Sequence, residues 1–154
     1  MTNSIRNICV DKLKTVLAEI NGAGDYNYSI TGGVHRYSVN PIPNADVPVI
    51  YIHENREDYT YMNVPHINRR LSVTLEVWLE TDEEAVGVAK ASANILSDIE
   101  RVIQTNTTLD GNAIDINFIG NEVFASQDRL PRCGVLLDVE IVYRTRDTSP
   151  SALV

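Results

Sequence analysis

Apolar and polar residues alternate strictly along residues 69–80 of the chain. Every second residue there is apolar, which is the period that buries one face of a strand: Leu71, Val73, Leu75, Val77 and Leu79. The same period returns in residues 134–146 and, over a shorter stretch, in residues 113–119, where Ile114, Ile116 and Phe118 are expected to point inward. These segments predict three strands, each with one buried face.

Two other segments repeat their apolar residues at the spacing of an α-helix. Residues 5–20 place their apolar side chains on one helical face, and Ser4 is the expected N-cap. Residues 81–84, Thr-Asp-Glu-Glu, form a capping box. This box predicts the start of a second, longer helix that extends to about Gln104.

The region between the first helix and the first clear strand has a different texture. Residues 25–65 hold six of the seven tyrosines together with Gly32, Gly33 and a group of prolines, which favours short strands joined by long turns. Residues 47–53 are apolar on both faces and predict a strand. Residues 54–65 are polar and aromatic, and we expect a loop or a hairpin tip there. Residues 121–131 are expected to be a polar connection, and residues 147–154 a mobile tail.

The order helix, strands, helix, strands predicts the fold class. We expect an α+β protein with an antiparallel or mixed β-sheet, two α-helices packed on one face, and a protruding β-hairpin or long loop. Residues 1–146 fit one domain, because a chain of 154 residues is of ordinary single-domain size.

Composition and charge narrow the range of partners. The formal net charge of −8 argues against general affinity for DNA or for an anionic membrane, since both bind through Lys and Arg. Cys9 and Cys133 lie in apolar segments and are expected to behave as small buried side chains rather than as a disulfide. We expect neither a signal peptide nor a spanning helix, and therefore a chain that stays in the cytoplasm where it is made.

The residues that could carry catalysis lack the spacing that catalysis requires. His35, His53 and His66 match none of the common metal-ligand or nucleophile motifs. The acids of residues 82–84 fit a helix N-terminus, and Gly32-Gly33 reads as a turn rather than a phosphate loop. We therefore expect no catalytic residue, no cofactor and no metal. A small hydrolase or ligand-binding domain that uses His53, His66 and the acids of residues 54–58 is kept as the rival hypothesis.

The aromatic residues outside the core pattern are better suited to binding other proteins. Tyr59, Tyr61 and Met62 belong to residue types enriched in interfaces, and we expect them to contact another subunit or a partner. Four arginines flank the ends of predicted strands and are candidates for ion pairs between subunits, with ion pairs inside the chain as the alternative: Arg69, Arg70, Arg144 and Arg146.

The layout as a whole resembles the tail terminator proteins of long-tailed bacteriophages. The segments that carry the resemblance are the strand RRLSVTLEVWLE, the helix TDEEAVGVAKASANILSDIERVIQ, the turn TNTTLDGNAIDI and the closing strand GVLLDVEIVYRTRDTSP. They follow an N-terminal helix and a tyrosine- and proline-rich central region. The likeness spans most of the chain and is one of layout, without a catalytic signature.

The resemblance implies a structural virion protein and not an enzyme. Such proteins form a ring, commonly a hexamer, that caps the tail tube, ends its polymerisation and presents a surface to the head connector. The implied partners are other copies of the chain, the tail-tube protein and a head-completion or connector protein, with DNA only as cargo that passes through the ring. The implied location is the tail or neck of the virion, after assembly in the bacterial cytoplasm. Another neck or tail component, such as a head-completion or tail-tube protein, is the alternative within the same class.

Overall fold

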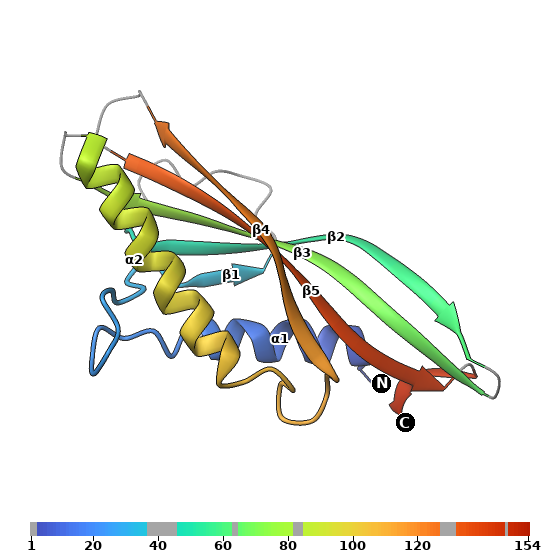
Figure 1. Cartoon of the computed structure of the whole chain (residues 1–154). Helices are drawn as coiled ribbons and strands as arrows, with labels where there is room; N and C mark the ends of the chain where they lie inside the picture. Colours follow the sequence, from blue (N-terminus) through green and yellow to red (C-terminus); the bar gives the residue numbers. More distant parts are fainter. Residues whose placement is uncertain (1–2, 37–45, 63–64, 82–84, 127–131, 147) are drawn as a thin grey trace.

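In the part of the chain that the structure describes, six strands form one mixed sheet, and two helices accompany it (Figure 1). The computed structural model describes residues 3–36, 46–62, 65–81, 85–126, 132–146 and 148–154. The helices are α1 (Ile5–Leu17) and α2 (Ala85–Gln104). The strands are β1 (Val34–Arg36), β2 (Val49–Tyr61), β3 (His66–Glu80), β4 (Asp115–Ser126), β5 (Arg132–Arg146) and β6 (Ser149–Leu153). The predicted α+β class and the predicted antiparallel or mixed sheet are therefore confirmed.

The sheet is built around β3, which pairs along its whole length with β5. The strand order is β1-β2-β3-β5-β4, and β6 pairs with the end of β5. Only the pairing of β1 with β2 is parallel among the pairings described, and the others are antiparallel. Strands β2, β3 and β5 continue side by side well beyond β1, toward the right-hand end of Figure 1. This extended end of the sheet becomes important below.

One continuous apolar core holds the elements together. The alternate residues of β3 and β5 that the sequence predicted to be buried are all less than about 2% exposed, from Leu71 to Leu79 and from Val135 to Tyr143. Buried side chains from α1, α2, β2 and β4 belong to the same cluster. Because apolar burial is the main favourable term in folding, this cluster fixes the register of the long strands.

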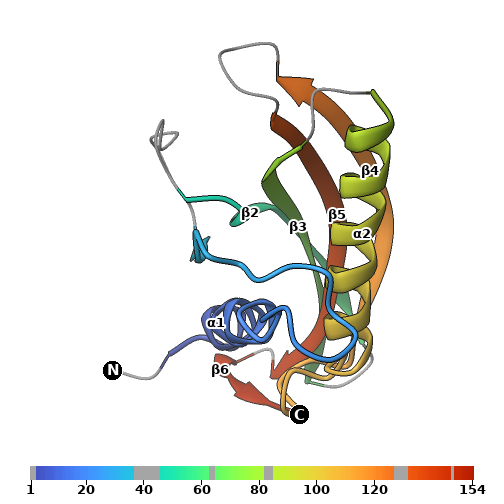
Figure 2. The same cartoon turned by 90° about the vertical axis from the view of Figure 1, so that its left-hand side faces the viewer.

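Helix α1 begins and ends where local chemistry dictates. The Ser4 hydroxyl accepts a hydrogen bond from the Asn7 amide at 3.2 Å, which confirms Ser4 as the N-cap. The helix ends at Leu17, three residues earlier than predicted, and Gly22 follows with a positive φ of 73°. Figure 2 shows α1 beside β6 and the C-terminus.

Three segments that the sequence analysis left outside strands are strands. Residues 54–61 continue β2, residues 121–126 continue β4, and Ser149–Leu153 form β6 within the tail that was expected to be mobile. Their backbones are ordered by pairing with a neighbouring strand, although much of their surface faces solvent. Ile114 was also expected to point inward, but it is 50% exposed because β4 begins only at Asp115. Asp82, Glu83 and Glu84 of the predicted capping box lie outside the described residues.

Neither α1 nor α2 combines the length and the apolar character that crossing a bilayer requires.

Candidate interaction surface

The sequence nominated seven interface residues from three separate segments, and strand pairing brings them to one end of the sheet. We call this the hairpin end: residues 56–62 of β2 and its exit, 66–70 of β3, and 142–146 of β5. Tyr59 pairs with Arg69, which pairs with Tyr143 on the next strand. The other nominated residues lie within a few positions of that row: Tyr61, Met62, Arg70, Arg144 and Arg146.

The hairpin end carries large apolar side chains in contact with solvent. Tyr61 is 76% exposed, Tyr59 is 53% exposed and Met62 is 47% exposed. Leu153 of β6 pairs with Thr145, so it lies across the sheet at the level of Tyr61, and it is 39% exposed. A protein gains nothing in its own stability from leaving such a set of side chains in water, so the set is a candidate contact surface.

The nominated arginines have different surroundings. Arg69 donates from Nε to the Thr145 hydroxyl at 2.9 Å, and its guanidinium carbon lies 4.8 Å from the centre of the Tyr59 ring. Arg70 is 3.3 Å from a Glu140 carboxylate oxygen. Arg144 donates to the side chain of Asn68 at 2.7 Å, and Arg146 is exposed.

The sequence left open whether the arginines form ion pairs inside the chain or between subunits. Arg69 and Arg70 form ion pairs inside the chain, with Glu57 and Glu140. The pair of Arg70 is exposed and contributes little to stability. A partner could therefore replace it at little cost, whereas Arg69 is held in place.

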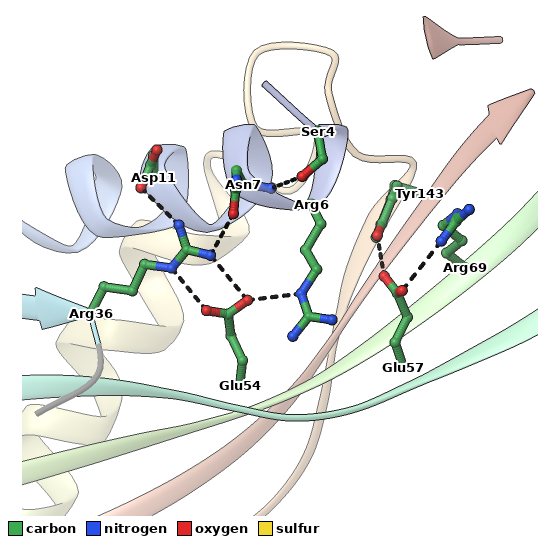
Figure 3. A network of polar contacts seen from close by, with 9 residues as sticks. All are labelled: Ser4, Arg6, Asn7, Asp11, Arg36, Glu54, Glu57, Arg69 and Tyr143. Atoms are coloured by element: carbon green, nitrogen blue, oxygen red, sulfur yellow. Dashed lines mark hydrogen bonds and ion pairs between the residues drawn. The ribbon is translucent and has the colours of Figure 1, made fainter. Parts of the chain in front are cut away.

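Arg69, which lies over the Tyr59 ring, belongs to a partly buried polar triad with Glu57 and Tyr143. Figure 3 shows the three side chains. The Tyr143 hydroxyl donates a hydrogen bond to Glu57, and Arg69 lies 3.3 Å from the other carboxylate oxygen. Burial raises the pKa of Tyr143, and the hydrogen bond to Glu57 raises it further, so the hydroxyl keeps its proton. The triad holds Arg69 over the Tyr59 ring, which orients an aromatic side chain that the core does not reach.

A second polar cluster joins α1 to the sheet next to the triad. Glu54 of β2 accepts from Arg6 at 2.9 Å and from Arg36 of β1 at 2.8 Å, and Arg36 also donates to Asn7 at 2.8 Å (Figure 3). Burial by itself raises the pKa of Glu54, but the hydrogen bonds from Arg36 and Arg6 lower it more, so the pKa lies below its ordinary value of 4.5. The cluster fixes the first half of α1 over the point where the hairpin end begins.

Sequence reasoning missed both polar groups and the contribution of β6. Glu54 and Glu57 were assigned to a solvated loop, and nothing local marks them as buried. Their partners are far away in the chain: Arg6 is 48 residues from Glu54, and Tyr143 is 86 residues from Glu57. The only available signal was the alternation of Glu57, Tyr59 and Tyr61, which would have favoured a strand.

The groups of the rival enzyme hypothesis lie apart from one another. His53 is 2.7 Å from Glu76, and alternation along β2 places it on the face opposite Glu54. His66 pairs with Arg146 at the start of β3, eight residues along that strand from the position opposite His53, which is about 26 Å at the rise of a strand. Within the described residues, no group of three or more His, Cys, Asp or Glu side chains is arranged to hold a metal ion.

No family model matches the chain, and no curated protein is similar to it.

Proposed function

We propose that this chain is a structural subunit of a bacteriophage tail, a terminator that forms a ring on the tail tube and ends its polymerisation. The observation that carries the proposal is the hairpin end, where Tyr59, Tyr61 and Met62 stand exposed beside four arginines. The resemblance in layout supplies the class of assembly, and the hairpin end supplies the contact surface that such an assembly needs.

Physical chemistry supports a binding role for these residues. Tyrosine, methionine and arginine are enriched where proteins meet, and aromatic side chains lose little conformational freedom on binding. Tyr59 is already oriented by Arg69, which lowers the entropy cost of contact further. The exposed apolar set extends through Leu153 into β6, so the surface is wider than the hairpin alone.

The proposal includes an arrangement of the whole subunit. Both helices pack on one face of the sheet, and the hairpin end protrudes as the element that reaches a neighbour. Subunit-to-subunit contacts, commonly six around a ring, use one part of this surface, and the tail-tube protein uses another. A head-completion or connector protein binds the opposite side of the ring, in the neck of the virion.

The net charge of −8 agrees with a ring through which DNA passes. Acidic protein surfaces repel phosphate and do not hold the passing strand. DNA is then cargo and not a ligand.

Reconstitution on purified tail tubes tests the proposal. The wild-type chain should stop further growth of the tubes and appear in electron micrographs as a ring at one tube end. A tube protein would instead polymerise into tubes of its own, and a head-completion protein would bind the connector without stopping tube growth. Either of those results would contradict the terminator role.

A double variant, Tyr61→Ala with Met62→Ala, should lose capping of the tubes. Lys90→Ala, an exposed change near the start of α2, is the matched control and should cap as the wild type does. Equal capping by the double variant and the control would remove the hairpin end from the proposed contact.

A further inference from the structure

Among the residues that the structure describes, the sheet has two strand edges without a partner strand, on opposite sides. β4 is the last strand of the order and pairs only with β5 in the described part of the chain. On the other side, β1 pairs with residues 50–52 of β2, and no described strand covers residues 56–61 beyond it. Backbone groups along such edges are ready to pair with another strand.

Both edges contain a regular run of similar length. The register of β2 shifts between Glu54 and Arg56, after which residues 56–61 pair regularly with β3. The register of β4 shifts between Phe118 and Gly120, after which residues 120–126 pair regularly with β5. Each run is therefore long enough to form several hydrogen bonds with a strand added at its edge.

The strand order determines how two copies could join through these edges. β2 and β5 run in the same direction, and β4 runs opposite to both, since every pairing between them is antiparallel. If β4 of one copy lies beside β2 of a second copy with corresponding faces of the two sheets on the same side, the two strands are antiparallel. The joined sheet then continues the antiparallel alternation of strand direction that runs from β2 to β4.

The side chains at the two edges are complementary. Ile119 and Val123 of β4 are 64% and 41% exposed, and aromatic residues pair well with β-branched ones across strands. The hairpin end offers Tyr59 and Tyr61. Residues 56–61 hold one arginine and two acids, and β4 holds Asp115 and Glu122, so the match between the edges rests on the apolar side chains and not on charge. β4 also lacks the proline and lysine residues that commonly block a free edge.

We propose that β4 of one copy pairs, antiparallel, with residues 56–61 of β2 in a second copy. The contact uses two different surfaces, so every copy offers one of each, and repetition closes a ring or extends a filament. β1 occupies the edge beside residues 50–52, so neighbouring copies are displaced along the strands, and a constant stagger is how sheets close on themselves. The inference deepens the proposed function, because it names the contact that builds the ring.

Disulfide crosslinking of mixed variants that each carry one added cysteine tests the pairing directly. One set replaces Tyr59, Thr60 or Tyr61 by Cys, and the other replaces Asn121, Glu122 or Val123 by Cys. The native thiols give little background, since Cys9 and Cys133 are both fully buried and burial raises the pKa of Cys9 to about 12. Each variant is oxidised alone and with each member of the other set, in a concentration series that ends at the solubility limit.

A covalent dimer should form only when a β2 variant is mixed with a β4 variant. It should form at some positions and not at others, because a disulfide needs Cβ atoms about 4 Å apart. Adding Val123→Lys to a partner that crosslinks through Asn121→Cys should abolish the dimer, while circular dichroism shows an unchanged fold. Lys90→Ala in the same background is the control and should leave the dimer yield unchanged.

Two results would overturn the pairing. Crosslinking of a variant with itself would show a contact between identical surfaces, and no crosslinking in any mixture across the whole series would show that the edges do not meet. The experiment contains no tail tube. A positive result with a failure to cap tubes would therefore leave the pairing in place and remove only the terminator role.

Discussion

The two ends of the same long strands are stabilised by different forces. From Leu71 to Leu79, alternate residues of β3 are fully buried in the common core. Toward the hairpin end the buried apolar residues described are Ile67 and Tyr143, and polar groups hold the strands: Glu57 with Arg69 and Tyr143 in the hairpin end, and Glu54 with Arg6 and Arg36 just before it. The core end supplies most of the apolar burial that drives folding, whereas the hairpin end leaves Tyr59, Tyr61 and Met62 exposed to solvent.

The largest expected effect is a loss of core packing. Leu75→Ala removes a fully buried side chain from the middle of β3 and should lower the free energy of unfolding by about 2–5 kcal/mol. Leu136→Ala, on the half-buried opposite face of β5, is the matched control and should cost clearly less. Chemical denaturation of both variants measures the difference. Equal losses would mean that the two faces of the sheet are equally buried, for example by another copy.

The sequence could predict the core end because a strand with one buried face has an apolar residue at every second position. This pattern is present in Leu71–Leu79 and Val135–Tyr143, and Ser4 predicts the start of α1. The hairpin end has no such pattern. Residues 56–61 form a strand because their backbone pairs with residues 67–72 of β3, where Arg69 lies over the Tyr59 ring, and this pairing depends on the tertiary fold.

The sequence could predict which exposed residues form the candidate surface, but not the polar triad and strand β6 that lie next to them. Tyr59, Tyr61 and Met62 stood out because they lie outside any core pattern, and the structure leaves them exposed. The triad next to them joins residues up to 86 positions apart, and Leu153 belongs to a segment that carried no strand signal. Such long-range contacts are not encoded in any local window of the sequence.

The next effect in size concerns the triad that supports the hairpin end. Glu57→Gln removes the negative charge beside the nearly buried Arg69 and should cost about 1–3 kcal/mol, because a buried guanidinium loses its counter-charge. Asp58→Asn is the matched control one residue away. Its pair with Arg56 is exposed, so the cost should be at most about 1 kcal/mol. If both changes cost the same, the triad does not stabilise this end of the sheet.

The cluster around Glu54 should make the attachment of α1 depend on pH. The pKa of Glu54 is lower in the folded chain than its ordinary value of 4.5, so the folded state favours the ionised form. The resulting stability is fully present above about pH 4.5 and is lost as the pH falls through the lower folded pKa. Glu54→Gln lacks this contribution, so the gap in unfolding free energy between wild type and variant should narrow on acidification. A gap that is constant between about pH 6 and about pH 3 would contradict the lowered pKa.

The smallest effect on stability should come with the largest effect on assembly, at Tyr61. Its side chain is 76% exposed and has lost little of its contact with water, so Tyr61→Ala should change the free energy of unfolding by no more than about 0.5 kcal/mol. The same change should weaken association with another copy or with the tube, because interface energy concentrates in such aromatic residues. Tyr143→Phe reverses the pattern, since it removes only a buried hydroxyl from the triad and should lower stability while leaving the exposed surface unchanged. Thermal unfolding of the two variants measures stability, and sedimentation measures association. A Tyr61→Ala protein that is destabilised but assembles normally would show that this tyrosine stabilises the fold and does not contact a partner.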